Sequence, residues 1–201
     1  MNAPVAIPPP DDGLARIGPG SVLELVPLMD DVLGEAERDR LLMISGMPEL
    51  PPDQGMMAET PAATLHQALR ADHPTLAPAL TIRAGERTAD HIIARRIPKA
   101  ALQVMHHLPP WLSAPLLASV IAKHAWTFAG SGKFKVLSKQ PLVFALTDNP
   151  VVRGEHSEEP ICDWHSAVFQ RLFSSIVDPN LRCVETHCCA SGSKSCIFEI
   201  R

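Results

Sequence analysis

The 201-residue chain is 46% hydrophobic and 20% charged, with a formal net charge of −4 at pH 7. This length and composition are typical of one globular domain, or two small ones, with a buried core. Because the chain has no basic excess to attract a phosphate backbone, nucleic acid is excluded as an expected partner.

The chain begins with a proline-rich segment, and we expect residues 1–20 to be flexible. The stretch Met1–Gly13 contains three consecutive prolines and no Lys or Arg, so it lacks the features of a signal peptide. The most apolar later stretch, Leu112–Phe128, is interrupted by Lys123 and His124. It is shorter than the about twenty residues that span a bilayer. The sequence therefore predicts a cytoplasmic protein without a transmembrane segment.

Helical patterns dominate from residue 21 to about residue 128. Ser21 can cap a first helix that Gly34 ends, and Pro27 is a candidate for a kink in it. The spacing of apolar residues predicts further helices at Glu35–Met43, Glu59–Arg70, Gly85–Arg96, Pro98–His107 and Leu112–Phe128.

The pattern then changes to that of short strands around one more helix. Two strands are expected on either side of Gln140-Pro141, and a helix with one apolar face is expected at Asp163–Val177. Two last strands are predicted at Leu181–His187 and Ser195–Ile200. The predicted fold class is α+β: a helical N-terminal half, followed by a small antiparallel sheet with one crossing helix.

All five cysteines lie in the last forty residues. An odd, one-sided set differs from a disulfide scaffold and favours a reducing compartment and one local role. If Gly192 is the centre of the final turn, Cys188 and Cys196 face each other across the strands, close enough to share one ion. Cys162 precedes a predicted helix, whose N-terminus favours a thiolate.

Glu185 is the fourth candidate ligand, three residues before Cys188. In a regular strand the two side chains point to opposite faces, so a bulge or a strand end near Thr186 is required. Three thiolates and one carboxylate form a closed set that suits Zn(II) as a structural ion. Ordinary buried cysteines and an iron–sulfur cluster are the alternatives. Four other residues are expected outside the set or as substitute ligands: Cys183, Cys189, His165 and His187.

A distinctive pattern occupies the same region: Cys162-Asp163-Trp164-His165, then Glu185-Thr186-His187-Cys188, Gly192 and Cys196-Ile197-Phe198-Glu199-Ile200. It resembles the 4-vinyl-reductase domain family, from about Arg83 to the C-terminus. The resemblance implies a fold related to heme-nitric-oxide-binding domains and to a vesicle-tethering subunit. It implies a flexible segment at 1–20, a helical region at 21–82 and a small-molecule-binding domain at 83–201. It also implies zinc binding, because aromatic-sensing members bind zinc through a matching Cys, Glu-x-x-Cys and Cys.

The resemblance further implies a tetrapyrrole-binding protein of bacteriochlorophyll biosynthesis, which binds or carries a (proto)chlorophyllide or magnesium-porphyrin intermediate. The alternatives are reduction of the 8-vinyl group of such a pigment, and a dimeric small-molecule sensor or adaptor. The sequence has no readable nicotinamide, flavin or iron–sulfur site, so a carrier is favoured over a reductase. The expected partners are the tetrapyrrole, other enzymes of this pathway and a second copy of the chain.

The helical half carries the candidate pigment ligands, which are His91, His106, His124 and Trp126. An imidazole on an apolar helix can bind the central metal of a tetrapyrrole, although a packed or surface histidine is the alternative for each. His124 is the first to test because Trp126 and its apolar neighbours surround it. The phosphate-loop-like Gly130-Ser131-Gly132-Lys133 lacks the following Ser or Thr and is expected to be a flexible turn.

Overall fold

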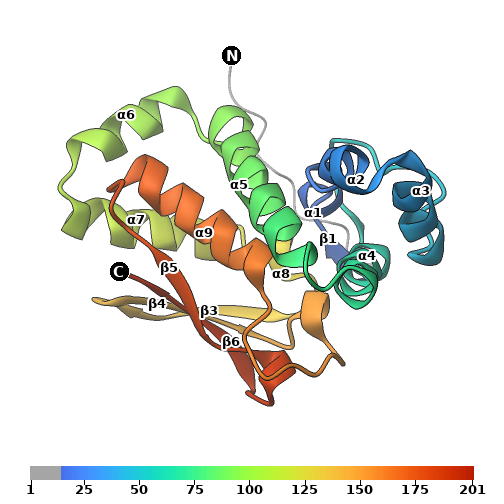
Figure 1. Ribbon diagram of the computed structural model, residues 1–201. Helices are drawn as coiled ribbons and strands as arrows, with labels where there is room; N and C mark the ends of the chain where they lie inside the picture. The colour runs from blue at the N-terminus through green and yellow to red at the C-terminus, as the bar shows by residue number, and fades with distance from the viewer. Residues whose placement is uncertain (1–14) are drawn as a thin grey trace.

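The computed structural model describes residues 15–201, and in it helices lie over one face of an antiparallel sheet (Figure 1). The helices are α1 Gly20–Leu23, α2 Val26–Leu33, α3 Glu35–Ile44, α4 Glu59–Asp72, α5 Ala77–Arg95, α6 Lys99–His107, α7 Pro110–Lys123, α8 Trp126–Ala129 and α9 Asp163–Ile176. The strands are β1 Arg16–Ile17, β2 Met57–Ala58, β3 Lys133–Lys139, β4 Leu142–Thr147, β5 Cys183–His187 and β6 Ser195–Ile200. Two 3₁₀ turns occupy Pro150–Val152 and Cys189–Ser191.

The main sheet has the order β3-β4-β6-β5, and every neighbouring pair is antiparallel. The last strand, β6, therefore lies in the interior of the sheet, between β4 and β5. The helix α9 crosses over the sheet and α5 packs on α9 (Figure 1). The predicted α+β architecture, with a helical first half and a crossing helix, is confirmed.

A cluster of phenylalanines joins α9 to the sheet. The ring of Phe169 on α9 lies 5.1 Å from that of Phe144 on β4 and 5.2 Å from that of Phe198 on β6, measured between centroids. All three side chains are fully buried. Period-2 alternation in the strands and the apolar face of α9 meet here, and together they form the hydrophobic core that holds the end of α9 in place.

Several helices differ from the sequence prediction at their ends. The first helix is divided into α1 and α2, and Pro27 stands in the first turn of α2, where its missing N–H removes no helical bond. The predicted Leu112–Phe128 helix ends at Lys123, because His124 leaves helical geometry before α8 begins. The helix α5 begins at Ala77, ahead of the predicted Gly85, with Pro78 in its first turn.

The sequence predicts a flexible segment before α1. Residues 1–14 of it lie outside the described residues. In the remainder, β1 pairs with β2, and the Gly18 amide donates a 2.7 Å hydrogen bond to the carbonyl of Thr127. These backbone bonds join residues 16–18 to two distant segments. The predicted boundary between residues 82 and 83 lies inside α5, and the division of the chain into regions stays a prediction.

Candidate metal centre

Four side chains from three separate segments meet at one end of the sheet. They belong to Cys162, Glu185, Cys188 and Cys196, and their ligand atoms all lie within 4.8 Å of one another. Cys162 is the residue that precedes the first turn of α9, as the sequence predicted. The three cysteines are buried and Glu185 is partly buried. The structure thus brings together the four residues of the predicted ligand set.

The hairpin of β5 and β6 explains how Glu185 and Cys188 reach the same point. The pairs Glu185–Phe198 and His187–Ile197 differ by one residue in register, which leaves Thr186 as the extra residue of a bulge. The predicted irregularity near Thr186 is confirmed. Because a shift of one residue reverses the face of a strand, the bulge turns both side chains to the same side.

The spacing of the sulfur atoms is suited to a tetrahedral ion. The Sγ atom of Cys188 lies 3.8 Å from that of Cys162 and 3.9 Å from that of Cys196, and the remaining sulfur pair is 3.2 Å apart. A tetrahedral zinc ion with Zn–S bonds of about 2.3 Å places its sulfur ligands about 3.8 Å apart. Glu185 Oε2 accepts a 2.8 Å bond from the Cys162 amide, whereas its buried Oε1 has no partner among residues 15–201. The donor set and the orphaned oxygen therefore fit a bound cation.

The electrostatics of the cluster lead to the same requirement. Burial raises the pKa of the Cys162 thiol, and burial together with the charge of Cys188 raises the pKa of Glu185 to about 8. Hydrogen bonds from the thiols of Cys162 and Cys196 hold the pKa of Cys188 far below its usual value. The cluster therefore favours one negative charge, and a cation is needed before all four groups can ionise together.

Asn149 supports the cluster, and the sequence analysis did not find it. Its Nδ2 lies 3.1 Å from Cys162 Sγ and 3.7 Å from Cys196 Sγ, as a donor to both. The side chain is fully buried, and its Oδ1 accepts a bond from the Val151 amide. Donors of this kind favour the thiolate form and orient metal ligands. Sequence alone offers only a turn signal at this position, because Asn149 is followed by Pro150.

The substitute ligands lie outside the four-residue set. His165 is buried, its Nε2 lies 3.3 Å from the carbonyl of Phe128, and burial lowers its pKa to about 4. His187 is exposed, with Nδ1 3.1 Å from the hydroxyl of Thr186. Cys183 is buried apart from the cluster, and its amide donates to Gln170 Oε1. Cys189 lies in the turn, and its amide donates to Cys196 Sγ at 3.4 Å.

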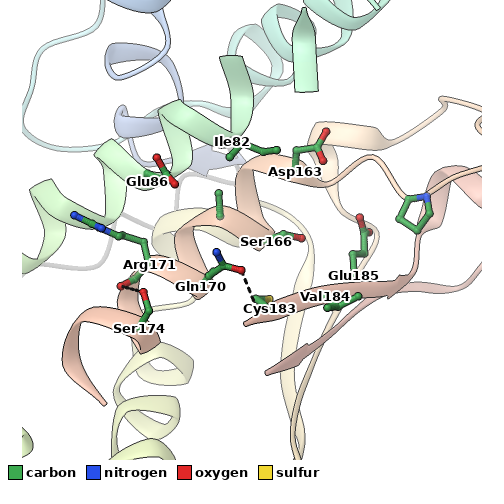
Figure 2. A pocket seen from close by; sticks show the side chains of 12 residues that line it. Ile82, Glu86, Asp163, Ser166, Gln170, Arg171, Ser174, Cys183, Val184 and Glu185 are labelled. Carbon is green, nitrogen blue, oxygen red and sulfur yellow. Dashed lines mark hydrogen bonds between the residues drawn. The ribbon is translucent and has the colours of Figure 1, made fainter. Parts of the chain in front are cut away.

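A cavity of about 440 Å³ lies between α5, α9 and β5, on the outer side of Glu185 (Figure 2). Its wall contains three carboxylates, from Glu86, Asp163 and Glu185, and one guanidinium, from Arg171. Burial raises the pKa of Asp163. This polar wall suits water or a small polar molecule better than a flat apolar macrocycle.

The four candidate pigment residues lie elsewhere, on the helices. His91 on α5 faces Glu24, with a 3.5 Å distance between Nδ1 and a carboxylate oxygen. His106 is exposed near the end of α6. His124 and Trp126 are half-buried on either side of the break between α7 and α8. None of the four lines the cavity beside Glu185.

The C-terminal part of the chain has the fold of a known domain. The 4-vinyl-reductase domain matches residues 142–201, which include the whole ligand set. An Fe(II) unliganded H-NOX protein from K. algicida superposes with a TM-score of 0.59 at 14% identity, covering 92% of this chain and 96% of that one. At such low identity the superposition defines the fold only.

Two relatives place the chain more closely. The bacteriochlorophyll synthase 23 kDa chain of Cereibacter sphaeroides is 49% identical over 92% of this chain and 90% of its own length. The protein of the same name from Rhodobacter capsulatus is 45% identical over 96% of this chain and 90% of its own length. The chain therefore belongs to the family of the bacteriochlorophyll synthase 23 kDa chain, and the resemblance to 4-vinyl-reductase domains is confirmed.

Proposed function

We propose that this protein works in bacteriochlorophyll biosynthesis as a tetrapyrrole-binding protein, which holds a chlorophyllide-type or magnesium-porphyrin intermediate and passes it between enzymes. The observation that carries the proposal is the 45–49% identity to bacteriochlorophyll synthase 23 kDa chains over more than nine-tenths of the sequence. Identity over this much of the chain covers the helical half as well as the 4-vinyl-reductase domain, so it supports a shared role for both.

The metal centre is structural in this proposal. Its four protein ligands complete a tetrahedral set, whereas a catalytic zinc site has three protein ligands and one open position. The three thiols are buried, which keeps substrate away from the ion. Zinc in this place ties the start of α9 to the final hairpin, and its binding free energy becomes folding free energy.

Pigment binding is assigned to the helical side. His124 leaves helical geometry at the end of α7, so its imidazole stands at a break between two helices, and Trp126 follows at the start of α8. Such a position lets a ring nitrogen approach the central metal of a planar pigment. His106 is a second candidate, because it is exposed. His91 ranks below these two, since Glu24 is its neighbour.

A pigment titration tests the carrier proposal. Purified protein is mixed with divinyl protochlorophyllide, with and without NADPH, and both the Soret spectrum and the products are followed. Stoichiometric binding without turnover is expected, with weaker binding for His124→Ala and unchanged binding for His187→Ala, an exposed histidine beside the metal cluster. Turnover with no added partner protein would establish a reductase instead, and absence of any spectral change would contradict pigment binding.

Elemental analysis tests the zinc assignment. About one zinc per chain is expected in the native protein, and Cys188→Ser is expected to lose the metal and much of the folding stability. Cys183→Ser is the matched control, because Cys183 is also buried but lies apart from the cluster. Native protein free of zinc, or equal metal loss in both variants, contradicts the assignment.

A further inference from the structure

Charge is distributed very unevenly along this chain. Residues 91–147 contain no Asp or Glu, yet they contain seven basic residues: Arg95, Arg96, Lys99, Lys123, Lys133, Lys135 and Lys139. The other 11 of the 18 basic residues stand against all 22 acidic residues, so the rest of the chain has a net charge of −11. A protein with a small net charge thus contains a segment of charge +7.

The same segment exposes large apolar side chains. On α7, Leu112, Leu116 and Val120 follow one another at four-residue spacing, so they form a single stripe on the helix surface, and all three are exposed. Trp111 at the start of this helix is 63% exposed, and Val104 on α6 is 59% exposed. An exposed tryptophan beside an aliphatic stripe is costly in water and indicates a binding surface.

Basic side chains border this apolar stripe. Lys123 lies three residues after Val120, at the end of the stripe, and Lys99 begins α6. The neighbouring strand β3, which packs against α7, turns three lysines outward along the edge of the sheet. In the described part of the chain, no salt bridge neutralises any of the seven bases. We call the exposed residues Lys99, Val104, Trp111, Leu112, Leu116, Val120 and Lys123 the α6–α7 surface.

We propose that the α6–α7 surface binds to the face of a lipid bilayer that contains anionic headgroups. Tryptophan is the side chain that prefers the bilayer interface, and aliphatic side chains can enter it to a shallow depth. Lysine and arginine are attracted by the negative surface potential, whereas the strongly acidic remainder is repelled. The protein is thereby oriented with α6 and α7 toward the lipid. Each helix in the described part is too short or too polar to cross the bilayer, so binding is peripheral.

A second copy of the chain is a poorer occupant for this surface. A twofold dimer places the same patch of each subunit against the other. Here that contact brings lysines and arginines together with no acidic residue of the segment to compensate them. Charge complementarity therefore favours an anionic lipid surface over self-association.

Co-sedimentation with vesicles tests the proposal. The full chain is mixed with phosphatidylcholine vesicles that contain 30% phosphatidylglycerol (about one anionic lipid in three, a content in the range where polybasic surfaces bind) or none. Binding is expected only to the anionic vesicles, with a marked loss at high salt because exposed charges are screened. Equal binding to neutral vesicles, or no binding to either, overturns the proposal.

Variants locate the surface. Lys99→Gln with Lys123→Gln is expected to weaken the partition coefficient about 25-fold, since each base near the lipid contributes about fivefold. Leu116→Gln is expected to remove most of the remaining binding. Lys194→Gln and Met43→Gln are matched controls, because both side chains are exposed on other parts of the molecule. Equal losses in the controls, or undiminished binding in the α6–α7 variants, overturn the assignment.

Tryptophan fluorescence gives an independent readout. The chain has three tryptophans, of which Trp164 is buried, Trp126 is half-buried and Trp111 is exposed. A blue shift of the emission is expected when anionic vesicles are added to the native protein. Trp111→Phe is expected to keep most of the co-sedimentation and lose the shift. A shift that persists in this variant contradicts insertion through α7. Zinc content and circular dichroism equal to those of the native protein show that each variant is folded.

Discussion

The contact between α5 and α9 makes Gly85 a position where one added methyl group is costly. A Cβ atom built on Gly85 lies 2.5 Å from the carbonyl oxygen of Trp164 and 2.8 Å from the Cβ of Ala167. Both atoms belong to α9, and neither is the end of a flexible side chain. The substitution Gly85→Ala therefore forces the two helices apart.

The magnitude is the difference between two effects. Overpacking of a tight core contact costs about 1–3 kcal/mol, and the upper end applies here because a backbone oxygen cannot rotate away. Alanine in a helix interior is favoured over glycine by about 1 kcal/mol. The expected net loss is about 2 kcal/mol of unfolding free energy, or about 4–8 °C in Tm for a chain of this size.

Guanidinium denaturation and thermal melting measure this loss. Ala94→Gly, at an exposed position of the same helix, is the control that measures helix propensity alone. Adding Ala167→Gly to Gly85→Ala removes the contact at 2.8 Å but keeps the contact with the Trp164 oxygen, so only part of the stability should return. A Gly85→Ala protein as stable as the native chain would refute the reasoning, since propensity would then outweigh the packing.

Three further effects follow from buried side chains in the helices and the core. Burial lowers the pKa of His66 from 6.5 to about 3. The unfolded chain therefore binds a proton first as the pH falls below 6.5, and stability is complete above that pH and lost below it. At pH 5 the loss from this residue is about 2 kcal/mol, which denaturation of His66→Gln at pH 5 and pH 7.5 should show to be absent. Phe169→Ala should cost about 3–5 kcal/mol and reduce near-ultraviolet circular dichroism; a loss below 1 kcal/mol would show that the phenylalanine cluster is not the core. Glu59 accepts bonds from both the amide and the hydroxyl of Ser131, so Glu59→Gln should cost about 1–2 kcal/mol and speed hydrogen exchange at the Ser131 amide. Unchanged exchange there would mean that the turn does not depend on this carboxylate.

Most of the fold class and the ligand set could be predicted because they depend on local patterns. The apolar periodicity of α9 and the alternation in β5 and β6 are properties of a few consecutive residues. The hairpin register follows from the position of Gly192, and the chemistry of Glu185 and Cys188 requires the bulge that the structure has at Thr186. Adjacent positions in a hairpin are fixed by counting, so the metal cluster was accessible from sequence.

Other features depend on contacts between residues far apart in the chain. Glu59 holds the turn at Ser131, which the sequence had suggested to be flexible, across 72 residues. Asn149 reaches two ligand sulfurs that belong to different segments. No local pattern marks either partner, because a hydrogen bond of this kind exists only when packing has brought both groups together and removed water from them.

The sequence by itself determined the alternation of helices and strands, the four ligand residues and the segregation of basic residues into 91–147, since each is a matter of residue type and spacing. The tertiary structure decided where helices break and which faces stay exposed. Gly85 belongs inside α5, despite its low helix propensity, because α9 packs too closely for a side chain. Leu112, Leu116 and Val120 look like core residues in sequence, yet they face solvent because α7 turns its other face, with Leu117 and Ile121, toward the protein interior.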